Sequence, residues 1–341
     1  MIDINSTSRL CVRVGALQGY SSLLEKMGRR PEPLLKEQGL TLEMLDHPEL
    51  MIPYASFESL LHETAEALNM PDFGLQLGAS QDLLLLGDIG SLMLHSQSLS
   101  QAMNYARNYA SLHVRAEYWA VEEDEANCYI TRYQHQRTHN YKRQNVELSL
   151  AACYRIIQLL VGPDFNLQGV HFTHQPISSL SHYRSFFSSR VSFNQERDMI
   201  YFSREYLKKE LKTFDQDTEI KLRSIIDSKL GAIEIDIEEQ TRSLILASLG
   251  QDTAMLDHIA KLLNLHPRTL QRRLLNKGTN FKNLVLDTKM ETARWVLHNS
   301  QMSITQLSNM LGYSDTSAFS KAFKVYHGQS PKHWRATSSR C

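Results

Sequence analysis

A pattern of two short amphipathic helices joined by a tight turn occurs twice in the last third of the chain, about fifty residues apart. We expect the first copy at residues 255–277, with Pro267 at the start of its second helix. Proline suits this position because the first helical turn does not need its N–H group. Leu270 and Leu274 are one helical turn apart and predict the buried face of that helix. The pattern is that of a helix–turn–helix unit.

The second copy follows further along the chain and carries clear signals at its helix ends. Ser303 and Gln306 have the spacing of a capping box at the start of its first helix. Gly312 permits a sharp exit from that helix, and Ser314 or Asp315 can cap the next one. The predicted buried stripe of this second helix consists of Phe319, Ala322, Phe323 and Tyr326.

A third amphipathic helix is expected between the two units, at residues 281–298, with Leu286, Met290, Ala293 and Leu297 on one face. Eighteen residues of helix span about 27 Å. Successive major-groove segments on one side of B-DNA lie about 34 Å apart. A rigid connector of this length can therefore present two helices to adjacent segments of the groove.

The formal net charge of zero hides an asymmetry between the two parts of the chain. Residues 250–341 contain 13 Lys and Arg against 5 Asp and Glu, whereas residues 1–249 contain 24 against 32. A basic module attracts polyanions such as the DNA backbone. A basic domain can also simply balance an acidic one, and charge alone leaves both interpretations open.

Arg268, Gln271 and Arg272 have the spacing that places side chains on one surface of a helix. Arginine can bind the O6 and N7 atoms of guanine with two hydrogen bonds, and glutamine can do the same with N6 and N7 of adenine. The three residues are therefore candidates for reading bases. The alternative is an ordinary solvated helix face.

The stretch Asp257–Arg335 resembles the DNA-binding domain of the AraC/XylS family over about eighty residues. The matching segments are His266–Leu274, Lys289–Leu297, Ile304–Lys324 and Gly328–Pro331. The resemblance implies double-stranded promoter or operator DNA and RNA polymerase as partners. It implies DNA-contacting positions at Arg268, Thr269, Gln271 and Arg272 in the first unit, and at Thr316, Ser317, Ser320 and Lys321 in the second.

One departure concerns the second recognition helix, which offers small hydroxyl groups where some relatives have longer side chains. We therefore expect it to contact mainly phosphates and to leave most base discrimination to the first recognition helix.

The remainder of the chain predicts an α+β domain at residues 1–210, a helical linker region at 211–250, and the tandem helix–turn–helix domain at 251–341. The expected elements of the first domain are helices at 58–68, 99–112 and 146–161, a β-hairpin at 114–121 and 127–133, and strands at 170–173 and 199–202. The fold class is thus an α+β effector or dimerisation domain followed by an all-α domain.

Residues Leu86–Ser96, together with Leu99, Ala102, Tyr105 and the pair Leu112-His113, are similar to the amino-terminal domain of the AraC subgroup that contains ornithine- and arginine-responsive regulators. This similarity implies a sensing or dimerising domain rather than a small cupin barrel. The chain is accordingly expected to be a transcription activator controlled by a small-molecule effector. A homodimer is a further expectation, with residues 219–249 and the acidic domain as candidate interfaces.

The effector site is not defined by the sequence. The basic and aromatic segment Arg132–Arg143 could hold an anionic effector, but a solvated loop after a strand has the same composition. Two other functions stay open as alternatives. One is a ligand-independent DNA-binding or dimerisation protein, and the other is an enzyme fused to a DNA-binding domain.

Catalysis, a metal site and a cofactor are not expected. None of the four cysteines lies in a Pro-Cys-His context or in a closely spaced pair, and no glycine-rich phosphate loop occurs. His171 and His174 would be split across the two faces of a strand. No apolar run is long enough for a membrane span, and no signal peptide begins the chain, so a cytoplasmic location is expected.

Overall fold

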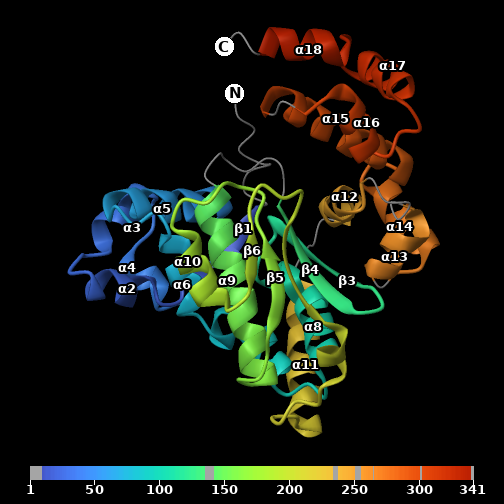
Figure 1. Cartoon of the computed structure of the whole chain (residues 1–341). Coiled ribbons are helices and arrows are strands. Elements are labelled where there is room, and N and C mark those ends of the chain that lie inside the picture. The colour runs from blue at the N-terminus through green and yellow to red at the C-terminus, as the bar shows by residue number, and fades with distance from the viewer. Residues whose placement is uncertain are drawn as a thin grey trace. The chain divides into compact units, whose positions relative to one another are not determined.

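A computed structural model describes residues 10–134, 142–232, 237–249, 255–263, 265–299 and 302–338. The chain divides into two compact units, Met1–Ile233 and Glu234–Cys341. The first is a mixed α/β unit and the second is helical, which confirms the predicted fold class (Figure 1).

The first unit is built on a five-stranded sheet with the order β3-β4-β7-β5-β6. The strands are β3 Glu117–Glu123, β4 Asn127–Gln134, β5 Leu167–His171, β6 Arg190–Ser192 and β7 Asp198–Ser203. All neighbours pair antiparallel except β5 and β6. The predicted hairpin is confirmed as β3 and β4, whose turn is held by Asp124 through the backbone N–H groups of Ala126 and Asn127. The short strand β6 was not predicted, because three residues are too few to show a period of two.

A second, two-stranded sheet pairs β1 Cys11–Arg13 with β2 Met51–Pro53. Neither strand was predicted, for the same reason of length. Pro53 is also the N-cap residue of the long helix α5 Tyr54–Ala67, so the chain turns directly from strand into helix. This pairing fixes the start of the helical layer beside the larger sheet (Figure 1).

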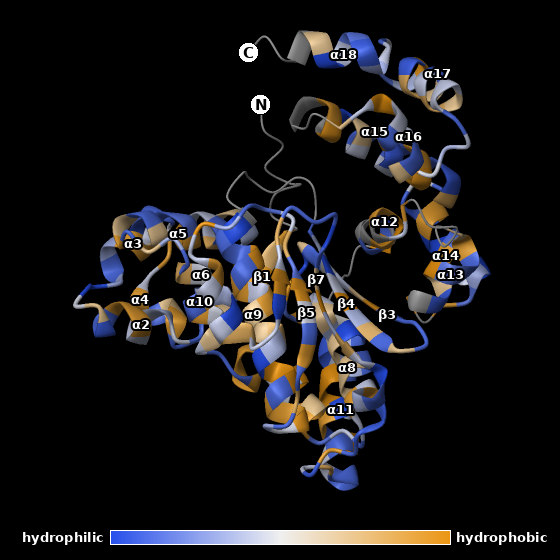
Figure 2. Cartoon of the chain, viewed as in Figure 1, coloured by the Kyte–Doolittle hydropathy of each residue, from blue (hydrophilic) through white to orange (hydrophobic). Residues whose placement is uncertain are grey.

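The helices of the first unit are amphipathic, with apolar and polar stripes (Figure 2). Besides α5 they are α2 Tyr20–Lys26, α3 Glu32–Glu37, α4 Leu42–Leu45, α6 Phe73–Ala79, α7 Asp88–Leu94, α8 Leu99–Tyr109, α9 Lys142–Val161, α10 Leu180–Phe187 and α11 Gln216–Ala232. Four 3-10 turns complete them: η1 Val14–Leu17, η2 Leu83–Leu86, η3 Ala110–Leu112 and η4 Arg204–Lys208. The predicted helices at 58–68, 99–112 and 146–161 correspond to α5, α8 with η3, and α9.

Two glycines allow helix α6 to lie directly against α9. A Cβ atom on Gly74 would be 1.9 Å from the carbonyl oxygen of Gln144, and one on Gly78 would be 2.4 Å from that of Leu148. The backbone N–H of Gly74 donates to the side chain of Gln144 at 2.7 Å. Because α9 is held so closely on this side, its other faces are fixed against α8 and strand β7.

The second unit consists of α12 Ile237–Ala247, α13 Leu256–Leu262, α14 Pro267–Asn276, α15 Phe281–Asn299, α16 Ile304–Met310, α17 Thr316–His327 and α18 Pro331–Ser338. The predicted end signals are confirmed. Pro267 occupies the first turn of α14, the Ser303 and Gln306 capping box starts α16, and Asp315 caps α17. Gly312 and Gly328 adopt the left-handed conformation after α16 and α17.

Two predictions about buried faces in this unit were wrong in part. Tyr326 is 41% exposed, because its ring points out of the α17 stripe and its hydroxyl donates to Asp287 at 2.8 Å. Leu286 is 39% exposed, although Met290, Ala293 and Leu297 on the same helix are buried.

The segment 211–250 contains two helices that pack within different units. Helix α11 packs against α7 in the first unit, and α12 packs against α13, α14 and α15 in the second. Residues 233–236, between these helices, lie outside the described residues.

One carboxyl group of the first unit is enclosed without a charged hydrogen-bond donor among the residues that the structure describes. Glu147 is fully buried, the hydroxyl of Tyr183 donates to it at 2.8 Å, and the ring of His174 is 3.7 Å away. Burial raises the pKa of Glu147 to about 8. The carboxyl therefore favours the neutral form in the folded protein.

The raised pKa predicts a loss of stability with rising pH. The stabilising effect of the neutral carboxyl is complete below the ordinary pKa of 4.5 and is lost as pH rises through about 8. Across this window each pH unit corresponds to at most about 1.4 kcal/mol. Glu147→Gln should thus gain stability relative to the wild type between pH 5 and pH 8, measured by urea unfolding. Parallel pH curves for the two proteins would contradict the prediction.

Candidate nucleic-acid interface and ligand cavity

Helix α14 presents three long polar side chains to solvent. Arg268, Gln271 and Arg272 are exposed, as the spacing predicted, and Thr269 is half-buried. Leu270 and Leu274 on the other side are completely buried and hold the helix to its unit. The N-cap residue His266 accepts the backbone N–H of Arg268 with its ring Nδ1 at 3.3 Å, so the first turn of the helix is fixed.

Helix α17 has the same design with shorter side chains. Ser317 and Lys321 are exposed, whereas Thr316 and Ser320 are half-buried. Phe319 and Phe323 are completely buried on the opposite face. Asp315 caps the helix by accepting the backbone N–H of Ala318 at 2.7 Å, and this hydrogen bond holds the pKa of Asp315 below its ordinary value.

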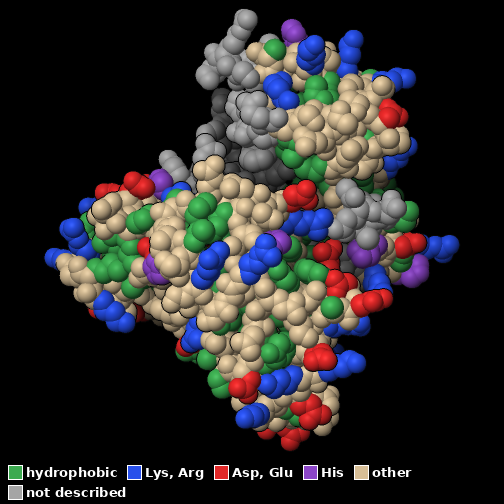
Figure 3. Space-filling view, viewed as in Figure 1, with side chains coloured by type: hydrophobic (Ala, Val, Ile, Leu, Met, Phe, Trp, Pro, Cys, Tyr) green, Lys and Arg blue, Asp and Glu red, His purple; other side chains and the backbone are tan. Residues whose placement is uncertain are grey.

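Helix α15 supports the second helix–turn–helix unit along much of its length. Its residues Met290, Ala293 and Leu297 belong to one apolar cluster with the two phenylalanines of α17. Lys289 lies over the ring of Tyr313, 4.8 Å from its centroid. Nineteen residues of helix correspond to about 28 Å, close to the predicted length. Figure 3 shows Lys and Arg side chains spread over the visible surface of the second unit.

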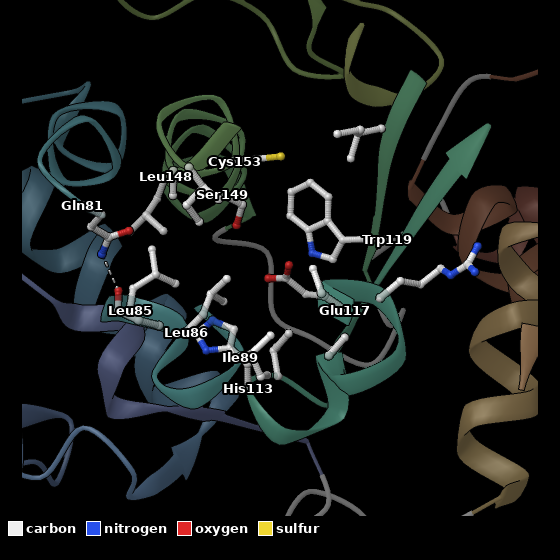
Figure 4. A pocket seen from close by; sticks show the side chains of 18 of the residues that line it. Gln81, Leu85, Leu86, Ile89, His113, Glu117, Trp119, Leu148, Ser149 and Cys153 are labelled. Atoms are coloured by element: carbon white, nitrogen blue, oxygen red, sulfur yellow. Dashed lines mark hydrogen bonds between the residues drawn. The ribbon is translucent and has the colours of Figure 1, made fainter. Parts of the chain in front are cut away.

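The first unit contains a cavity of about 160 Å³, which sequence reasoning missed (Figure 4). Its wall is mostly apolar and is formed by η2, α7, α8, β3 and α9 together with single residues of other elements. The side chains that line it include Leu85, Leu86, Ile89, Met103, Ala106, Trp119, Leu148, Ala152, Cys153 and Ile156. No local signal could have revealed it, because these residues come from segments far apart in the sequence.

One wall of the cavity carries a buried ion pair. The guanidinium of Arg132 donates to the Glu117 carboxylate through Nε at 2.9 Å and Nη2 at 2.6 Å. Tyr54 donates to the same carboxylate at 2.5 Å. Burial opposes the ionisation of Glu117, but Arg132 beside it keeps the pKa of the carboxyl below its ordinary value.

This pairing bears on the anionic-effector hypothesis for segment 132–143. Arg132 is buried, and its charge is compensated by Glu117, so it is not available to an external anion. Residues 135–141 of that segment lie outside the described residues.

Other polar side chains also line the cavity, and three of them, His113, Gln81 and Cys153, are uncharged at pH 7. Burial, with Arg13 nearby, lowers the pKa of His113 to about 4, and its Nδ1 has no hydrogen-bond partner among the described residues. Gln81 is buried and donates to the carbonyl of Ala16, but its Oε1 atom has no partner there either (Figure 4). Burial raises the pKa of the Cys153 thiol to about 12.

Helix α8 has two functional faces. Met103, Ala106 and Arg107 line the cavity. The opposite face is hydrogen-bonded to helix α11: Tyr105 donates to Glu219, and Tyr109 donates to Asp227 at 2.6 Å. Helix α11 is the last helix of the first unit, and the chain leaves this unit after it. Helix α8 therefore contacts both the cavity and the helix from which the chain leaves the unit.

Comparisons with known proteins agree with both halves of this description. A model of the arabinose-binding domain of AraC transcription regulators matches residues 28–211, more than half of the chain. A helix-turn-helix domain model matches residues 259–337. The chain belongs to the AraC family. The predicted resemblance is therefore confirmed, and the second unit is an AraC-type DNA-binding domain in a transcription regulator.

Relatives of this AraC-family protein are similar along their whole length. VirS, a helix-turn-helix transcriptional regulator of Mycobacterium tuberculosis, is 25% identical over 95% of this chain and 96% of its own. The ornithine utilization regulator of Pseudomonas aeruginosa is 23% identical over 97% and 98%. The crystal structure of CdpR from Pseudomonas aeruginosa is similar with a TM-score of 0.45, at 18% identity over 89% of this chain and 96% of that one.

In the ranges that the structure describes, no group of three or more His, Cys, Asp or Glu side chains is arranged to hold a metal ion. His171 packs against the ring of Tyr201, whereas His174 lies beside Glu147. Within the same ranges, no helix has the length and apolar character needed to cross a membrane.

Proposed function

We propose that this AraC-family protein activates transcription from promoters that it binds through α14 and α17, under the control of a small molecule held in its first unit. The observation that carries the DNA part is the pair of capped helices, each with a buried apolar face and an exposed polar one. On α14 that exposed face consists of two guanidinium groups and an amide, the groups best suited to base edges.

The two helices differ in the contacts that they can make. Arg268, Gln271 and Arg272 are long enough to reach base edges in the major groove. The face of α17 offers three hydroxyl groups and the ammonium group of Lys321, which suit phosphate oxygens. We therefore assign base discrimination mainly to α14 and positioning mainly to α17.

Effector control is supported by the cavity and by the double role of α8. A ligand that contacts Met103 and Ala106 can shift α8, and α8 holds α11 through Tyr105 and Tyr109. The binding of a ligand would then favour one arrangement of the chain over another. The name of the ornithine utilization regulator links a full-length relative to a small molecule, which supports effector control over the ligand-independent alternative. Contact with RNA polymerase and formation of a homodimer stay predictions.

Arg268→Ala tests base reading by α14. We expect it to weaken binding to the preferred DNA sequence by about 1–3 kcal/mol and to relax base preference at one position. The preferred sequence is first selected from a random pool of DNA. Fluorescence anisotropy with this sequence and with its single-base variants then measures both the affinity and the base preference. Arg273→Ala is the matched control, because this exposed arginine lies about 140° around the helix from Arg268. An equal loss on every sequence would instead make Arg268 a phosphate contact.

Lys321→Ala tests positioning by α17. Each phosphate contact releases counterions, so its loss should lower the slope of log affinity against log salt by about one. The control is Lys208→Ala, which removes the same charge from an exposed site in the first unit. If the slope equalled the wild-type value, we would conclude that Lys321 does not contact the DNA.

Tyr109→Phe tests the connection between cavity and exit helix. The substitution removes the 2.6 Å hydrogen bond to Asp227 but keeps the ring. We expect at least a threefold lower activated output from a reporter carrying the selected DNA sequence, with DNA affinity unchanged. Tyr129→Phe is the control, because its hydroxyl likewise donates to an aspartate at 2.6 Å, Asp124 in the turn between β3 and β4. If Tyr109→Phe and the control variant gave the same reporter output, effector control through α8 would be contradicted.

A further inference from the structure

The cavity of the first unit restricts the chemistry of what it can hold. Its volume of about 160 Å³ resembles that of an engineered cavity of about 150 Å³ in another protein, which binds benzene. A ligand of one or two rings, or a short aliphatic chain, is of suitable size. The wall is dominated by Leu, Ile, Met and Ala side chains with the indole of Trp119, so burial of apolar surface would drive binding.

A charged ligand group would find no free counter-charge in the carboxylate or the imidazole of this wall. Glu117 is fully engaged with Arg132 and Tyr54, and the pKa of His113 lies at about 4, so its ring is neutral at pH 7. A buried charge without a partner is strongly unfavourable. The cation of the wall, Arg107, is half-buried; its Nη2 donates to the neutral amide oxygen of Asn104 at 3.2 Å, and its buried Nε has no hydrogen-bond partner among the described residues.

Three polar atoms of residues that line the cavity lack a partner among the described residues: Gln81 Oε1, His113 Nδ1 and the Nε of Arg107. Gln81 Oε1 can only accept a hydrogen bond, and His113 Nδ1 is unpaired as well. Gln81 is fixed in this orientation because its Nε2 donates to the carbonyl oxygens of Ala16 and Gln18. Leaving a buried acceptor unpaired costs free energy that a hydroxyl or N–H group of a ligand would recover.

From these observations we infer that the effector of this regulator is an uncharged, largely apolar small molecule with one hydroxyl or N–H donor, which is directed at Gln81 and His113. The inference rests on the proposed effector control and adds the ligand class. It concerns the occupant of the cavity and is independent of the DNA-contacting residues.

The test uses three compounds with one ring system: 2-naphthol, its methyl ether and 2-naphthoate. Isothermal titration calorimetry on the full chain at neutral pH gives their affinities. We expect 2-naphthol to bind at least tenfold more tightly than the ionised naphthoate. It should also bind about three- to tenfold more tightly than the ether, which has no donor. This second difference should shrink in Gln81→Leu or in His113→Phe.

Two cavity-filling variants locate the binding site. Ala106→Phe fills the cavity from α8 and Cys153→Phe fills it from α9, and both positions are only partly buried, so a larger ring can be accommodated. Each should weaken binding of 2-naphthol at least tenfold. Leu159→Phe is the control, because this α9 residue is 45% exposed and does not line the cavity. Circular dichroism melting checks that each variant folds.

The possible results separate the ligand class from the function. Naphthoate binding as tightly as naphthol, and losing that affinity in Arg107→Gln, would overturn the inference in favour of an anionic ligand. Absence of binding by all three compounds would also overturn it and make the cavity a packing defect. Neither result would affect DNA binding, which the Arg268 and Lys321 variants test separately.

Discussion

The ion pair between Glu117 and Arg132, together with its hydrogen-bond partners, connects the five-stranded sheet of the first unit to helices α5 and α9. Its two residues belong to β3 and β4, Tyr54 adds helix α5, and Asn145 of α9 donates to the hydroxyl of Tyr54 at 2.5 Å. Two charges removed from water require each other, because either one alone would be left without compensation. The sheet, α5 and α9 are thus held in one arrangement beside the cavity. The same pairing compensates the charge of Glu117, the carboxylate of the cavity wall.

The second unit depends on helix α15 in a comparable way. Its apolar residues share one cluster with α16 and α17, and α18 packs against it from the C-terminal side. The guanidinium of Arg335 on α18 donates to the carbonyl oxygen of Met302 at 2.6 Å, just before α16. The exposed face of α17 is therefore set by contacts that reach back to the connector, and a rigid connector is what tandem recognition requires.

The DNA-binding unit could be predicted well from the sequence because its signals are local. The capping box at Ser303, the proline at 267 and the spacing of Arg268 and Gln271 each depend on residues within one or two helical turns. The exposure of Tyr326 could not be predicted, because it depends on Asp287 of another helix. The cavity shows the same limit more strongly. Gln81 and His113 are separated in the sequence, and only the packing of η2, α7, α8 and α9 brings them to one cavity.

Helices α14 and α17 are expected to contact DNA together. Hydroxyl-radical footprinting of the full chain, on a DNA sequence selected from a random pool, measures this. We expect two protected segments on one face of the duplex, about one helical turn apart, with the segment under α14 showing the stronger base preference. A single protected segment, unchanged by substitutions in α17, would contradict it.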